Sequence, residues 1–161
     1  MHRDTKGDRL MKAPAYALGL AGLIPFIALG FAAWIAPVTS LLPIVAIQAQ
    51  YAAAILAFLG ALYWGAALAL PEAQVQRPWL LLGWGVVLPL WAWRMTWGLS
   101  VAYSMTGLFI GLAIAYAADV MLRKQLPWPS WFLPLRLWLT LGALLGLGLT
   151  LVRLYTLNPA G

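Results

Sequence analysis

The sequence has 161 residues, of which 64% are hydrophobic and only 9% are charged, and its formal net charge is +6. Soluble globular domains are about 45–50% apolar and about 25% charged, so a soluble fold of this composition would expose large apolar patches and aggregate. The alternating polar and apolar segments of a membrane β-barrel are missing as well. The composition therefore predicts an all-α, polytopic integral membrane protein built as a helix bundle.

Five apolar runs are candidates to cross a bilayer, which takes about 20 residues of α-helix. The predicted spans cover residues 13–34, 44–70, 78–93, 97–122 and 131–155. We expect one membrane domain over residues 13–157, between a basic cytoplasmic tail (1–12) and a short external tail (158–161). The first run is too long for the core of a signal peptide, and we interpret it as a retained span.

Lysine and arginine predict the orientation of the spans, because these residues concentrate in cytoplasmic segments. With the N-terminus inside, only Arg94 and Arg153 fall outside. Eight basic residues then fall on the inner side: Arg3, Lys6, Arg9, Lys12, Arg77, Arg123, Lys124 and Arg136. We therefore predict an N-in, C-out protein of the bacterial cytoplasmic (inner) membrane. The positive charge reflects this topology and not a nucleic-acid partner.

The second span carries a stripe that an anchor would not need. Tyr51, Phe58 and Gly65 are spaced by seven residues and share one helix face, and Tyr63 and Trp64 add a hydroxyl and an indole near the end of the span. One interpretation is packing at the centre of the bundle. The other is a small pocket for a lipid or a quinone-like molecule. Of the two, we favour packing.

The third span contains Pro89, which has no N–H and clashes with the preceding turn. We therefore expect the helix to kink or break there. Its link to the fourth span, Arg94 to Trp97, is so short that the two spans are predicted to form an antiparallel hairpin.

Small residues mark the fourth and fifth spans. Gly107 and Gly111 form one Gly-x-x-x-Gly pattern, and Gly142 and Gly146 form another. Glycine lets helix backbones approach closely, which favours association where lipid provides no hydrophobic drive. We expect these faces to pack inside the monomer, with packing against a partner as the alternative.

One charged constellation lies near the inner ends of the last two spans. Asp119 precedes Arg123 by four residues, so the two side chains can meet on one helix face. In an antiparallel hairpin, Asp119 also reaches a depth similar to that of Arg136. An unpaired arginine at the centre of a membrane costs about 2.5–3.5 kcal/mol on insertion scales. We predict a structural Asp119–Arg136 ion pair, with Arg123 as a competitor and snorkelling of Arg136 to the headgroups as the alternative.

Residues suited to catalysis are scarce. The sequence has no cysteine, its single histidine is His2, and two of its four carboxylates belong to the N-terminal tail. This leaves no nucleophile paired with a base and no set of metal ligands. We expect a protein that is not an enzyme, with no catalytic residue, metal site or cofactor.

Several segments together resemble a known family. They are LGLAGLIPF (18–26), YAAAILAFLGALYWG (51–65), WGVVLPLWAW (84–93), Asp119 and LRLWLT (135–140). The sequence is similar to the small membrane proteins catalogued as domain of unknown function 3429, which include mitochondrial members. In that family a histidine often precedes the Trp-Gly of the second segment, whereas Tyr63 stands here. The resemblance implies the multi-pass topology and an inner-membrane or mitochondrial-type setting.

Two functions follow from these observations. The first is a non-catalytic accessory, assembly or stabilising component of a larger inner-membrane complex, which the short loops and glycine faces favour. The second is a small transporter or a lipid- or quinone-binding membrane protein. The expected partners are membrane lipids and either other membrane-protein subunits or a second copy of the chain.

Overall fold

The computed structural model describes residues 6–71, 77–126 and 128–157, and all regular structure in this part of the chain is helical. The elements are α1 (Lys6–Ala21), α2 (Ile24–Ile35), the short 3-10 helix η1 (Val38–Ser40), α3 (Leu41–Ala69), α4 (Pro78–Met95), α5 (Val101–Leu122) and α6 (Phe132–Leu157). The predicted C-terminal tail and residues 1–5 of the predicted N-terminal tail, including His2 and Arg3, lie outside the described residues.

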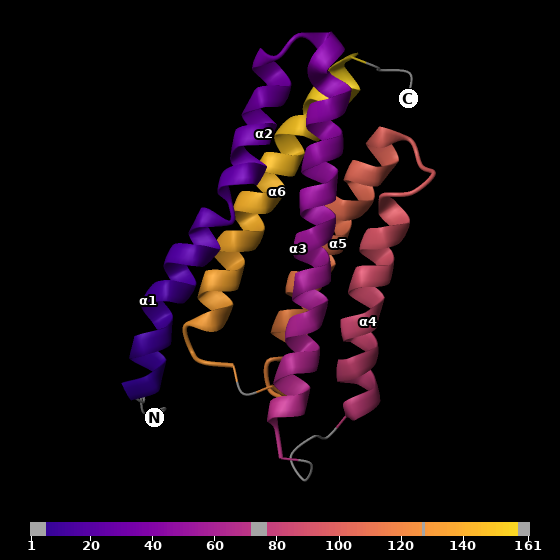
Figure 1. Cartoon of the computed structure of the whole chain (residues 1–161). Coiled ribbons are helices and arrows are strands. Elements are labelled where there is room, and N and C mark those ends of the chain that lie inside the picture. The colour runs from indigo at the N-terminus through magenta and orange to yellow at the C-terminus, as the bar shows by residue number, and fades with distance from the viewer. Residues whose placement is uncertain (1–5, 72–76, 127, 158–161) are drawn as a thin grey trace.

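The helices form an antiparallel bundle around α3. Figure 1 shows α2 and α6 on one side of α3, with α4 and α5 on the other. The most extensive helix–helix contacts are those of α3 with α4 and of α2 with α6. Helix α5 packs against both α3 and α6. The buried apolar side chains form one core that all of these helices share. The predicted all-α bundle is therefore confirmed.

Four helical stretches are long and apolar enough to cross a membrane: residues 10–35, 38–69, 101–122 and 132–157. Their outer faces carry large exposed apolar side chains such as Leu18, Ile35 and Leu68, as expected for surfaces solvated by lipid. The 18-residue helix α4 is not among these four. The chain is thus a multi-pass helical membrane protein with four spans assigned by length and hydropathy.

The first predicted span is broken rather than continuous. α1 ends at Ala21 and α2 begins at Ile24, with a turn at Gly22 and Leu23. Pro25 lies at the start of α2, where its missing N–H costs nothing but where a continuous helix would lose a hydrogen bond. The Tyr51 hydroxyl donates to the Gly22 carbonyl oxygen at 2.8 Å and so satisfies one acceptor at the break.

Helix α4 continues through Pro89 to Met95, so of the kink or break predicted at this proline, the break does not occur. Proline leaves the carbonyl of the residue four positions earlier, Gly85, without its helical donor. That carbonyl and the proline ring lie against Gly60 of α3, where a Cβ would be 2.5 Å from the Gly85 oxygen and 2.8 Å from Pro89 Cδ. The absence of a side chain at Gly60 lets α3 pack closely along the proline-containing face of α4.

The connection between α4 and α5 is longer than predicted, because α5 begins at Val101 and not at Trp97. Within this connection Gly98 adopts a positive φ of 69°, a conformation that glycine tolerates without a steric cost. Ser100 then caps α5, since its side chain accepts a hydrogen bond from the Tyr103 N–H at 3.5 Å.

The four predicted packing glycines all face neighbours within the chain. Gly107 lies against Met95, Gly111 against Leu56 and Trp91, and Gly142 against Leu23. Gly146 makes the closest approach, because a Cβ there would meet the backbone of Phe26, with the carbonyl carbon at 2.6 Å. These glycines therefore bring helices of one monomer together, which is the favoured sequence prediction.

Candidate functional site

The main polar feature of the bundle is a buried cluster that joins three helices. Arg136 of α6 donates from Nε to Oδ2 of Asp119 on α5 at 2.8 Å. The Tyr63 hydroxyl of α3 donates to the other carboxylate oxygen, Oδ1, at 2.5 Å. Asp119 and Arg136 are only 4% and 6% exposed. Both carboxylate oxygens are thus used, and the cluster links α3, α5 and α6.

The surroundings of this cluster explain why the charges are tolerated. Asp119 lies one turn before the end of α5 and Arg136 one turn after the start of α6, so the short connection brings them to the same depth. The ring of Trp128, in that connection, contacts Tyr63 edge-to-face with centroids 6.5 Å apart. Arg123, the predicted competitor, is exposed at the end of α5, and the described side chains show no ion pair between it and Asp119.

One donor of the cluster has no partner. Nη2 of Arg136 is buried and donates to no acceptor among the described residues. A buried donor without an acceptor costs about 1–3 kcal/mol, and more when it is charged. The ion pair with Asp119 therefore satisfies only part of the Arg136 guanidinium.

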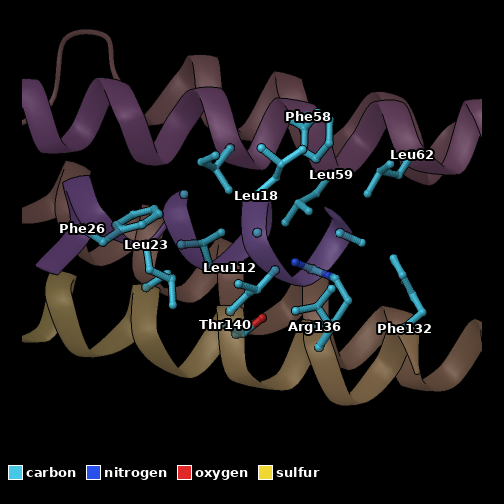
Figure 2. A pocket seen from close by; sticks show the side chains of 17 residues that line it. Leu18, Leu23, Phe26, Phe58, Leu59, Leu62, Leu112, Phe132, Arg136 and Thr140 are labelled. Atoms are coloured by element: carbon cyan, nitrogen blue, oxygen red, sulfur yellow. The ribbon is translucent and has the colours of Figure 1, made fainter. Parts of the chain in front are cut away.

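An apolar pocket lies beside Arg136. Its volume is about 370 Å³, and its walls come from α1, α2, α3 and α6, with Leu112 of α5 behind them. Figure 2 shows Arg136 and Thr140 on one side of the space, with Leu18, Phe58 and Leu59 across from them. Arg136 and Thr140 are the polar side chains in a lining that is otherwise hydrocarbon and aromatic.

A second polar cluster ties α3 to α2 and α6. Nε2 of Gln48 donates to the carbonyl oxygens of Phe26 at 3.0 Å and of Gly146 at 3.2 Å. Thr150 donates from its hydroxyl to Oε1 of Gln48 at 2.6 Å. The Gln48 amide thus uses both its nitrogen and its oxygen for hydrogen bonds between helices. We interpret this cluster as structural.

The predicted stripe on α3 divides into residues with different surroundings. Tyr51 donates a hydrogen bond to Gly22 at the break between α1 and α2. Phe58 is 58% exposed at the edge of the pocket. Gly65 is exposed and would meet no atom within 4 Å of an added Cβ, so its prediction as a packing residue is wrong. Trp64 lies half-exposed against α4, where its indole donates to the Leu82 carbonyl at 3.0 Å.

Sequence reasoning did not find the partners of Tyr63, Gln48 and Thr150. The available signal was polarity: an uncharged polar side chain in an apolar span needs an acceptor or donor on another helix. Which helix supplies it depends on how the spans are arranged around α3. Among the described residues, no group of three histidine or acidic side chains lies close enough to hold a metal ion.

These features define the chain as a multi-pass α-helical membrane protein whose helices are joined by buried polar clusters. It belongs to the family described as Protein of unknown function (DUF3429), which matches residues 11–152. The predicted family resemblance is therefore confirmed.

Two relatives carry the same printed name, Transmembrane protein 69. The relative from Xenopus tropicalis is 38% identical over 148 residues, which cover 89% of this chain and 56% of the relative. The relative from Mus musculus is 35% identical over 142 residues, covering 86% of this chain and 56% of the relative. The chain thus spans about half the length of these relatives. No solved structure matches it.

Proposed function

We propose that the protein is a non-catalytic accessory, assembly or stabilising component of a larger inner-membrane complex. The observation that supports this proposal is the use of its buried polar side chains. Asp119 and Tyr63 form hydrogen bonds that join helices, and Gln48 and Thr150 do the same in the second cluster. No nucleophile paired with a base occurs among the described buried polar residues. A rigid bundle of this kind suits a scaffolding role.

The proposal includes five spans with the N-terminus inside. α4 has 18 residues, which gives a length of about 27 Å against a hydrocarbon core of about 30 Å. It runs antiparallel to α3 along most of that helix, and α1 begins at the end of the bundle opposite to the end of α6 (Figure 1). The distribution of lysine and arginine favours the cytoplasmic (inner) membrane of a bacterium with this orientation.

The topology is tested by cysteine accessibility. Because the sequence has no native cysteine, only the introduced residue can react. Single cysteines at Lys124 and at Ser100, each exposed or next to an exposed loop, should react from opposite sides of sealed vesicles with a membrane-impermeant maleimide. Lys124 should be labelled from the cytoplasmic side and Ser100 from the outside. Labelling of both positions from one side would contradict a spanning α5 and the proposed orientation.

The accessory role is tested by the size of the native particle. We expect the tagged chain, expressed at its native level and extracted in a mild detergent, to migrate in a complex far larger than its 17.5 kDa, with other membrane proteins in stoichiometric amounts. The amounts of those partner proteins in the membrane should also decrease when the gene is deleted. Migration at monomer size under every mild extraction condition would overturn this role.

A second candidate function is binding of a lipid or quinone-like molecule inside the membrane. The specific observation in its favour is the pocket beside the unpaired nitrogen of Arg136. Transport has less support, because five spans cannot divide into two equal repeats of the kind that many transporters contain.

A further inference from the structure

The pocket has the form of a site for a molecule that enters from the bilayer. The side chains of Leu18 and Phe58 at its edge are largely exposed on the lipid-facing surface, so a hydrocarbon chain can reach the interior without crossing a polar barrier. At about 370 Å³ the pocket falls within the usual range of small-molecule sites, roughly 300–1,000 Å³. Along α6 it extends from Phe132 past Arg136 to Ala143.

The inner part of the pocket offers two polar side chains, Arg136 and Thr140, and the first carries the charge. Arg136 lines the pocket, is 6% exposed and has a buried Nη2 without an acceptor. Figure 2 shows its nitrogen-bearing end among the side chains that surround the space. A ligand atom that accepts a hydrogen bond there would remove the penalty of the unpaired donor. The ligand should therefore carry an acceptor at one end.

The charge balance of the cluster selects the kind of acceptor. Asp119 already neutralises Arg136 through a direct ion pair. An additional anion would leave a net negative charge in a region of low dielectric constant, which is unfavourable. A neutral carbonyl oxygen accepts a hydrogen bond from the guanidinium without adding charge. The apolar walls then suit a hydrocarbon or isoprenoid chain attached to that carbonyl.

We propose that this pocket binds an apolar-chain molecule that ends in a neutral carbonyl, which accepts a hydrogen bond from the guanidinium of Arg136. Two sources offer this chemistry: a quinone with a hydrophobic tail and a neutral acyl-ester lipid. The inference deepens and rests on the second candidate function above. It does not require the accessory role. Because that role is tested by the size of the native particle and this proposal by ligand binding, either one can be refuted without the other.

Binding is measured on the full-length chain in a detergent held at one fixed concentration, by titration with three probes. Decylubiquinone carries a quinone head, monoolein carries an acyl ester, and decylbenzene has the same tail as decylubiquinone but no acceptor. We expect at least one carbonyl probe to bind about tenfold more tightly than decylbenzene, the effect of one hydrogen bond to a charged donor. The tighter of the two identifies the source.

Two variants connect this binding to the pocket. Ala15→Phe places a ring at the pocket wall on α1, and Ala17→Phe adds the same ring to an exposed position of the same helix that does not line the pocket. Ala15→Phe should weaken binding of the preferred probe at least tenfold, whereas Ala17→Phe should leave it unchanged. The matched pair separates loss of the site from a general effect of a bulky residue on α1.

A third variant tests the donor itself. Asp119→Asn combined with Arg136→Met removes both charges together, which is less disruptive than removing one. The chain should stay folded by circular dichroism, and the preference for the carbonyl probe over decylbenzene should fall from about tenfold to about one. Equal binding of decylbenzene and both carbonyl probes to the original chain would overturn the proposal, as would unchanged binding in Ala15→Phe.

Discussion

Replacing Asp119 with asparagine is expected to lower the free energy of unfolding by about 2 kcal/mol. The change removes the charge that Nε of Arg136 contacts at 2.8 Å and leaves a guanidinium buried without a counter-ion. Breaking a buried pair costs about 3–5 kcal/mol in soluble proteins, whereas polar couplings inside membranes average about 0.6 kcal/mol. Our value lies between these because Arg136 is one turn from the start of α6, so its side chain can move partly toward the interface.

The double-mutant cycle decides whether the ion pair is the cause. Asp119→Asn with Arg136→Gln should be less destabilised than Asp119→Asn alone, measured by reversible unfolding with SDS in mixed micelles. Arg123→Gln is the control, because Arg123 is an exposed arginine near the same carboxylate and should change stability by less than about 0.5 kcal/mol. Additive effects of the two single changes would show that Asp119 and Arg136 do not interact.

Replacing Gly146 with alanine is expected to destabilise the bundle by about 1–3 kcal/mol or more, the usual range for overpacking. The added Cβ would lie 2.6 Å from the Phe26 carbonyl carbon, and backbone cannot turn aside as a flexible side chain can. Separating α2 from α6 would also strain the two hydrogen bonds that Gln48 donates across them. The same unfolding assay measures the effect.

Gly148→Ala is the matched control on the same helix. A Cβ at Gly148 would have its nearest neighbour, Cε2 of Phe109, at 3.9 Å, which is an ordinary contact. This change should be neutral or stabilise the helix by up to about 1 kcal/mol through the higher helix propensity of alanine. If Gly146→Ala were as stable as Gly148→Ala, the close approach of α2 and α6 would be refuted.

The ion pair was accessible from the sequence because both of its parts are local. Asp119 and Arg136 flank one short connection, so an antiparallel hairpin fixes their relative depth. The cost of a lone arginine in the membrane supplies the reason to pair them. The boundaries of the helices followed in the same way from runs of apolar residues, although Ser100 and Gly98 move the start of α5 beyond the predicted position.

Features that depend on a distant helix were not accessible in this way. Pro89 lies inside α4, and its ring packs against Gly60 of α3. Tyr63 donates to a carboxylate 56 positions away, and Gln48 accepts from a threonine 102 positions away. The pocket likewise requires five helices at once. Sequence periodicity describes the face of one helix and does not say which other face it meets.

The most direct test of this account is a cryo-electron microscopy structure of the chain in lipid nanodiscs at a resolution that shows side chains. The account predicts that the Arg136 guanidinium lies within hydrogen-bond distance of Asp119, with Tyr63 on the other carboxylate oxygen. It also predicts elongated density in the pocket that ends beside the Arg136 guanidinium. An Arg136 side chain extended to the lipid headgroups, with Asp119 unpaired and the pocket closed, would contradict it.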